Sequence, residues 1–249
     1  MAEKQGLRAV ITSGLAGQKT DIFVAAGVIS IVMMLLIPLP TVLLDLLMAS
    51  NLVLSVMIIL ITLYTKRALD FAIFPTMLLV TTVFSLALNV SSTRLILSKG
   101  AEFDGKIVTG FATFVVGTSG SEGLVIGLII FIILIAVQFI VITKGATRVA
   151  EVAARFTLDS LPGKQMAIEA EYNSGALTEE ESTRKKADLQ READFYGAMD
   201  GASKFVSGNV KIGILMTVIN IAGGLIVGML IHGEPLGSAV TNYITFAIG

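Results

Sequence analysis

The stretch LVIGLIIFIILIAVQFIVIT, residues 124–143, holds no charged side chain and is long enough to cross the hydrocarbon core of a bilayer as one helix. Four further stretches are also long and apolar enough to span a bilayer: 22–39, 41–64, 68–90 and 212–231. A sixth begins near Leu236 and is cut short at Gly249. With 54% hydrophobic and 15% charged residues, the chain is too apolar for a soluble domain of 249 residues. We therefore expect an all-α polytopic membrane protein with about five complete transmembrane helices plus a truncated sixth.

Charged residues divide the chain into segments. A polar N-terminal segment (1–21) precedes the first four spans (22–143), which include a polar, re-entrant outer region at 91–123. An insert of soluble composition (144–211) separates them from the last apolar segment (212–249). If the N-terminus and the insert are cytoplasmic, all but three of the 18 Lys and Arg residues lie on the cytoplasmic side, as the positive-inside rule requires.

The insert has the periodicity of helices. Four charged residues recur at steps of three and four and so share one helix face: Arg148, Glu151, Arg155 and Asp159. Pro162 is expected to break this helix, because proline lacks the backbone N–H that a helix interior uses. Thr178 and Glu181 have capping-box spacing and begin a second helix, which we expect to end at about Phe195. By spacing alone, the charged face is an ordinary solvated helix surface.

The residues contain no catalytic constellation. One histidine, His232, and no cysteine leave no zinc site, and no glycine loop with its lysine is present to bind a nucleotide phosphate. A net charge of -1 gives no basic field for nucleic acid. We expect neither an enzyme nor a nucleic-acid-binding protein, and no cofactor or metal.

Polar groups near the spans have more than one interpretation. Asp45 lies at the expected outer interface, where it is either a hydrated loop residue or a member of an ion path, since charges in membranes are costly and often functional. The pairs Gly123–Gly127 and Gly224–Gly228 have the GxxxG spacing of closely packed helices.

The segment RVAEVAARFTLDSLPGKQMAIEAE, residues 148–171, resembles the signature of the FHIPEP family, which contains flagellar and type III secretion export-gate proteins. Residues 38–40, 86–97, 138–145 and 192–208 look like the same family. The sequence of residues 193–204 resembles the flagellar branch of the family more than the virulence-secretion branch. The resemblance covers most of the chain.

The resemblance implies a place in the bacterial inner membrane, at the flagellar basal body. It implies about eight spans and a large cytoplasmic domain that receives exported proteins with their chaperones; here the chain ends where the family continues with an Asp-Gly pair. It also implies a homo-oligomeric ring, a nonamer, in contact with the lipid bilayer, other export membrane proteins and the export ATPase complex. The implied function is to couple proton or sodium motive force to protein export.

Carried over by position, the resemblance assigns importance to seven charges: Arg94, Arg148, Arg155, Asp159, Lys164, Asp200 and Lys204. Together with Asp45 and Glu151 they are the expected ion-coupling residues. We hypothesise that protonation of Asp200 alters its attraction to Arg148, Arg155 or Lys204 and so moves the insert. Asn209 stands where the family commonly has Asp, which argues against an obligatory proton carrier at that position.

Three alternatives remain open. The chain is a structural ring scaffold without ion conduction, the corresponding component of a virulence type III secretion system, or an independent small-solute transporter. A transporter predicts a polar midplane site built from broken helices, and the charge-free spans 124–143 and 212–231 argue against it.

Overall fold

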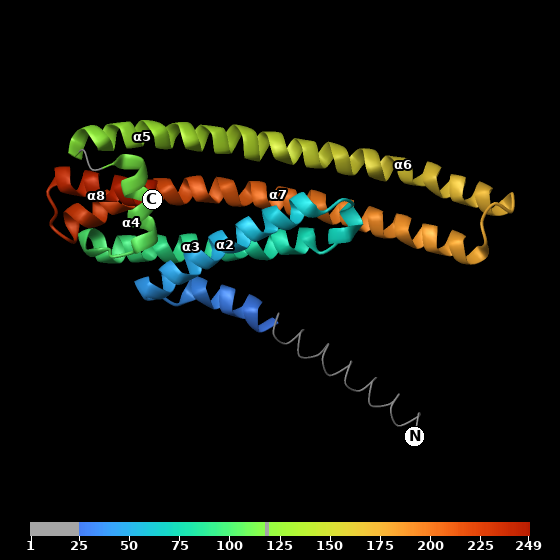
Figure 1. The fold of residues 1–249 in the computed structure, drawn as a ribbon. Helices are drawn as coiled ribbons and strands as arrows, with labels where there is room; N and C mark the ends of the chain where they lie inside the picture. Colours follow the sequence, from blue (N-terminus) through green and yellow to red (C-terminus); the bar gives the residue numbers. More distant parts are fainter. Residues whose placement is uncertain (1–24, 118–119) are drawn as a thin grey trace, which may run out of the picture.

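The computed structural model describes residues 25–117 and 120–249, and every regular element in these ranges is helical (Figure 1). The elements are a first helix (Ala25–Leu36), α2 (Thr41–Tyr64), the 3-10 turn η1 (Ala68–Phe71), α3 (Phe74–Lys99), the 3-10 turn η2 (Gly100–Glu102), α4 (Lys106–Val116), α5 (Gly120–Val137), the π-helix η3 (Gln138–Ala146), α6 (Thr147–Asn173), α7 (Glu179–Leu230) and α8 (Leu236–Ile248). The expected all-α class is confirmed.

Four helical stretches in the described ranges are long and apolar enough to cross a membrane: Thr41–Tyr64, Ala68–Glu102, Glu122–Asn173 and Glu179–Leu230. The first two correspond to the predicted spans 41–64 and 68–90. The predicted first span, 22–39, begins outside the described residues, and its described part is the shorter helix Ala25–Leu36. The expected count of five complete spans is therefore not confirmed.

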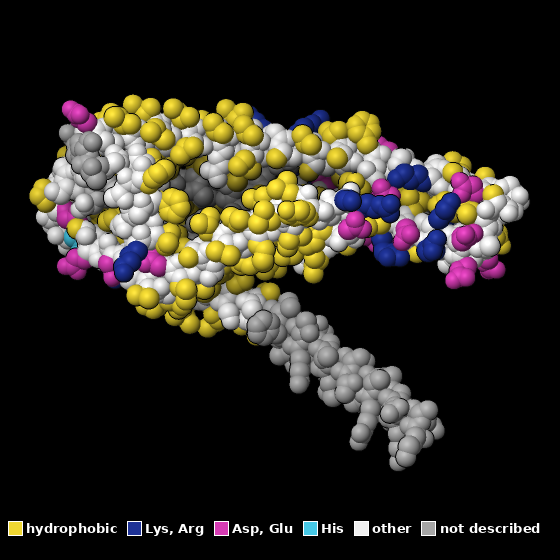
Figure 2. All heavy atoms as spheres, viewed as in Figure 1, with side chains coloured by type: hydrophobic (Ala, Val, Ile, Leu, Met, Phe, Trp, Pro, Cys, Tyr) yellow, Lys and Arg dark blue, Asp and Glu magenta, His cyan; other side chains and the backbone are white. Residues whose placement is uncertain are grey.

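Two helical rods dominate the molecule. Residues Glu122–Asn173 continue through α5, η3 and α6, and α7 returns alongside them (Figure 1). Each rod has 52 residues, or about 78 Å at 1.5 Å per residue. Because a hydrocarbon core is only about 30 Å thick, a rod that crosses one along its axis has well over half of its length outside. Figure 2 shows charged side chains gathered on the α6/α7 hairpin, hydrophobic side chains over most of the remaining helices, and a smaller group of charged side chains at the end opposite the hairpin.

The expected helix break at Pro162 is wrong, because α6 runs unbroken from Thr147 to Asn173 with the proline inside it. The proline cannot donate a backbone hydrogen bond, but the adjoining turns are mostly exposed, so water can solvate the freed carbonyl. The neighbouring Lys164 also pairs with Glu192 of α7 at 3.2 Å, which ties this turn to the other arm of the hairpin. Tertiary packing therefore overrides the local breaker.

The expected end of the second insert helix near Phe195 is also wrong. α7 continues to Leu230 and joins the insert to the predicted span 212–231 without interruption. Gly197, Gly201 and Gly208 each cost a helix about 1 kcal/mol relative to alanine, but contacts with α3, α6 and α8 along its length hold the helix together. The sequence boundaries at 143/144 and 211/212 both fall inside continuous helical structure.

The predicted capping box that begins α7 is confirmed. The Glu181 backbone N–H donates to Thr178 Oγ1 at 3.3 Å, and the Thr178 backbone N–H donates to Glu181 Oε2 at 2.9 Å. The bond from the Thr178 backbone N–H, and a second from the Thr178 hydroxyl to Glu181 Oε2 at 3.0 Å, lower the pKa of the Glu181 carboxyl below its ordinary value. The hairpin turn therefore starts α7 with an ionised carboxylate beside unpaired backbone N–H groups.

The best-packed region lies at the end opposite the hairpin, which we call the α8 end (η2, α4, α8 and the adjoining ends of α3 and α7). Its core consists of Leu44, Leu88, Leu95, Ile96, Phe103, Val108, Ala239 and Tyr243. The fully buried Tyr243 ring lies against Gly224 and Gly228 of α7. A Cβ built on Gly228 would stand 2.6 Å from Tyr243 Cε2, so the Gly224–Gly228 pair is a close-packing groove, as predicted.

Candidate functional site

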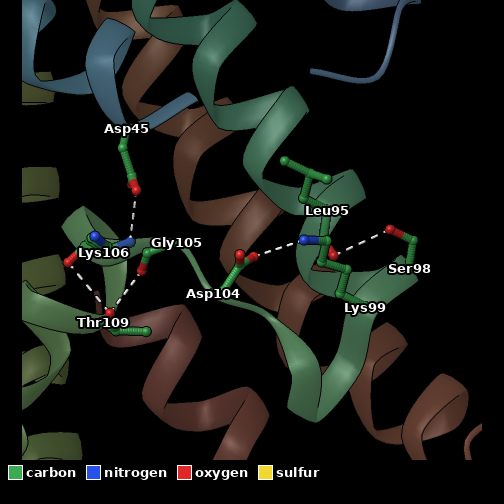
Figure 3. A network of polar contacts seen from close by, with 8 residues as sticks. All are labelled: Asp45, Leu95, Ser98, Lys99, Asp104, Gly105, Lys106 and Thr109. Carbon is green, nitrogen blue, oxygen red and sulfur yellow. Dashed lines mark hydrogen bonds and ion pairs between the residues drawn. The ribbon is translucent and has the colours of Figure 1, made fainter. Parts of the chain in front are cut away.

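At the α8 end, Asp45 joins α2 to the start of α4. Its two carboxylate oxygens accept hydrogen bonds from the backbone N–H groups of Lys106 at 2.9 Å and Ile107 at 3.0 Å; Figure 3 shows the bond to Lys106. These are N–H groups of the first helical turn, which have no partner within the helix. Asp45 therefore caps α4 from another helix, a contact across more than 60 residues that sequence spacing does not show.

Truncating Asp45 to alanine is expected to expose the first turn of α4. The loss of a capping acceptor costs about 1 kcal/mol, so the amide hydrogens of Lys106 and Ile107 should exchange several-fold faster in the full-length protein. Hydrogen-exchange mass spectrometry of peptides covering α4 measures this. Asp45→Asn, which keeps one acceptor oxygen, should show a smaller increase, and equal exchange in all three proteins would contradict the capping role.

Arg94, on α3, also forms hydrogen bonds with the end of another helix. Its guanidinium donates to the carbonyl oxygens of Leu36 at 2.9 Å and Leu35 at 3.1 Å, and Ser91 Oγ donates to Met34 O at 2.9 Å. These carbonyls belong to the last turn of the first helix, where they lack helical partners. Arg94 thus holds the end of that helix against α3.

The membrane-proximal end of the hairpin has an unusual backbone. η3 is a nine-residue π-helix between α5 and α6, although π-helices are rare, mostly single-turn, and frequent at functional sites. Ser207 Oγ of α7 donates to Thr143 O of η3 at 3.4 Å, while Thr143 Oγ1 is buried without a hydrogen-bond partner in the described part of the chain. The two rods therefore meet at an irregular, polar junction.

Four of the predicted charges lie at this junction, and we call them the junction site: Arg148, Glu151, Asp200 and Lys204. Asp200 Oδ2 accepts from Lys204 Nζ at 2.7 Å, and Arg148 Nη1 lies 3.2 Å from Glu151 Oε2. The hydrogen bond and charge of Asp200, and more weakly the charge of Glu151, raise the pKa of the Lys204 ammonium above its usual 10.5. The two ion pairs, one from each rod, are thus electrostatically linked.

Asp200 is the most enclosed member of the junction site, with 28% of its side chain exposed. Its second oxygen, Oδ1, is buried and finds no hydrogen-bond partner among the described residues. An unpaired carboxylate oxygen beside a membrane span is costly. This oxygen could accept a hydrogen bond from a molecule that enters the junction.

The other predicted charges lie further along the hairpin. Arg155 pairs with Asp159 at 3.7 Å on an exposed face of α6, and Lys164 pairs with Glu192 of α7. Two more cross-hairpin pairs, Lys185–Glu171 and Lys186–Glu169, hold the tip. The structure therefore does not bring Arg155 to Asp200; the partner of Asp200 is Lys204.

Sequence reasoning missed the π-helix and the junction contact between Thr143 and Ser207. A π-helix leaves no clear periodic signature in the uninterrupted apolar run of residues 139–142, so no sequence signal pointed to it. The Asp200–Lys204 pair, by contrast, has i,i+4 spacing and could be predicted from one helix.

Comparison with known proteins supports the resemblance. The flagellar biosynthesis protein FlhA of Borreliella burgdorferi is 64% identical over 231 residues, which is 93% of this chain and 33% of that protein. FlhA of Treponema pallidum is 57% identical over 230 residues (92% and 32%) and FlhA of Salmonella typhimurium 51% over 225 (89% and 32%). This chain spans about a third of the length of these curated relatives.

No solved structure matches the chain. The FHIPEP family matches residues 31–249, which include both rods, the junction site and the α8 end. The chain belongs to the FHIPEP family.

Proposed function

We propose that the chain is the membrane part of a component of the flagellar protein-export apparatus. The support is its identity of 51–64% to three proteins named flagellar biosynthesis protein FlhA, together with helices long and apolar enough to span a membrane. The corresponding virulence-secretion component is the less favoured alternative, because the relatives above carry the flagellar name.

We further propose that the junction site couples ion movement to export. The observation that carries this proposal is the half-satisfied carboxylate of Asp200, which is held by Lys204 between two rods that pass from an apolar region to a charged hairpin. A change in its charge would alter a contact at the base of that hairpin. Such a local charge change can bias a two-state element.

This proposal includes an arrangement in the cell. The N-terminus and the α6/α7 hairpin face the cytoplasm, the protein lies in the bacterial inner membrane at the flagellar basal body, and copies assemble into a ring, a nonamer. Its partners are the lipid bilayer, the other export membrane proteins, the export ATPase complex, and exported proteins with their chaperones. The reasons are the distribution of basic residues and the family resemblance.

The full-length protein reconstituted alone in lipid vesicles tests coupling against the scaffold alternative. With a proton or sodium gradient imposed, an ion-coupling protein should dissipate the gradient faster than protein-free vesicles, as followed by ion-sensitive dyes. A decay equal to that of empty vesicles under both gradients would favour the scaffold. The size and symmetry of the detergent-solubilised particle separately test the ring.

A further inference from the structure

A partly open, polar cavity of about 240 Å³ lies among α3, η3, α7 and α8, with Gly249 at its edge, and none of the four junction-site residues lines it. Its polar lining residues are Asn89, Ser92, Thr93, Gln138, Thr217 and Asn220. Asn220 is eight residues into the apolar run that begins at Ile212, about 12 Å along the helix axis. The cavity therefore lies well inside the part of the bundle that is apolar enough to face hydrocarbon.

Asn220 is the clearest sign that this cavity takes a polar ligand. Its side chain is 9% exposed, and Oδ1 is buried without a hydrogen-bond partner in the described ranges. Burying an amide oxygen without a partner is costly, and native structures rarely tolerate it. Asn220 is one of the residues that line the cavity, so its side chain borders the space that a bound molecule would occupy.

The hydroxyl groups beside Asn220 leave mainly acceptor positions for that molecule. Ser92 Oγ donates its proton to Asn89 O at 3.0 Å, and Thr217 Oγ1 donates to Gly213 O at 3.1 Å. Their oxygen lone pairs, like those of Asn220 Oδ1, remain open to accept. A small ligand that donates hydrogen bonds suits these oxygens, and the side-chain amides of Asn89 and Gln138 can in turn donate to it. None of the described side chains that line the cavity carries a charge that would demand a charged ligand.

We propose that this cavity is an intramembrane water site, in which bound water donates a hydrogen bond to Asn220 Oδ1. A water molecule occupies about 30 Å³ in the liquid and needs two to four polar partners, so the cavity has room and partners for several. Apolar cavities of similar size stay dry, and the six polar side chains distinguish this one. Water bound in this cavity would place polar solvent inside the apolar part of the bundle.

The site extends the proposed function, since Asn220 and Asp200 lie on the same helix. Water beside Asn220, in the apolar part of α7, would shorten the dry path of an ion moving toward the junction site, and only this consequence rests on the proposed ion coupling. The presence of water does not depend on it. The two ideas can therefore fail separately.

The test uses single cysteines, because residues 1–249 contain none. Thr217→Cys and Ser92→Cys are made in the full-length protein, with any cysteine beyond residue 249 changed to serine, and are labelled in membrane vesicles with a small water-soluble methanethiosulfonate. Val218→Cys is the matched control, because it neighbours Thr217 but is 55% exposed on the outer face of α7. Thiols react as thiolates, which form readily only where water is present.

We expect labelling at residues 92 and 217 to be at least tenfold faster than at residue 218. Adding Asn220→Leu to Thr217→Cys should slow labelling at least several-fold, because leucine removes the acceptor at similar volume; unchanged gel-filtration elution checks that the double variant is folded. Labelling as slow as at Val218→Cys, or no effect of Asn220→Leu, would overturn the water site. Fast labelling without ion flux in the vesicle assay would leave the water site standing and overturn ion coupling.

Discussion

Replacing Asp200 with asparagine is expected to abolish ion-driven export, lowering secreted flagellar protein at least tenfold, while ring assembly stays intact. Asparagine can still accept a hydrogen bond from Lys204, which now lies 2.7 Å from Asp200 Oδ2. It removes the negative charge and cannot take up a proton. Loss of the negative charge removes the attraction between residue 200 and the Lys204 ammonium, and a local charge change of this kind can bias a two-state element.

The measurement is swimming motility and secreted flagellar protein from cells that carry only the full-length variant. Asp188→Asn is the matched control, because Asp188 forms an exposed pair with Arg191 on the same helix at 3.0 Å. Exposed pairs contribute little, so this control should stay within twofold of the unaltered protein. Asp200→Glu should restore part of the activity. Normal motility with Asp200→Asn would refute the assignment.

The protonation states of the Asp200–Lys204 pair also restrict the mechanism. Asp200 raises the pKa of Lys204 above 10.5, so the stabilisation from the ammonium is complete at neutral pH and is lost only as the pH rises through that raised value. A fall in pH within the physiological range leaves Lys204 charged. A change of this pair that is driven by protons in the physiological range therefore does not come from Lys204.

Local features were predictable from the sequence. α2 has the predicted ends, Thr41 and Tyr64, because Pro40 precedes it and Lys66 and Arg67 follow it. The capping box at Thr178 was predictable for the same reason, since its hydrogen bonds join residues three apart. Both features depend on neighbours in the sequence.

The features that were not predicted correctly depend on contacts between residues far apart in the sequence. Pro162 and the glycines after Phe195 look like helix ends by propensity, yet packing between α6 and α7 keeps both helices continuous. Asp45 and Arg94 form hydrogen bonds with backbone groups about 60 residues away. No periodic pattern in the sequence predicts such contacts. The charge types at the candidate site were predictable, but the pairing of Arg155 with Asp159 rather than with Asp200 required the fold.

The second large effect is expected from Gly224, where a single methyl group meets the buried Tyr243 ring. On an open helix surface, Gly→Ala stabilises by about 1 kcal/mol. Here the added Cβ would overlap the ring, and overpacking of this kind costs about 1–3 kcal/mol. Because α8 is held in the core through that ring, we expect Gly224→Ala to lower the thermal unfolding midpoint of the solubilised full-length protein by several degrees.

Gly223→Ala is the matched control, since a Cβ there would lie 3.8 Å from Leu97 Cδ2, an ordinary contact. It should leave the midpoint unchanged or raise it. Tyr243→Ala removes the ring and leaves a cavity, which by itself costs about 3–5 kcal/mol, but adding Gly224→Ala to it should cost nothing more. If the two substitutions instead add, the groove does not hold Tyr243, because only residues in contact show a coupling energy in a double-mutant cycle.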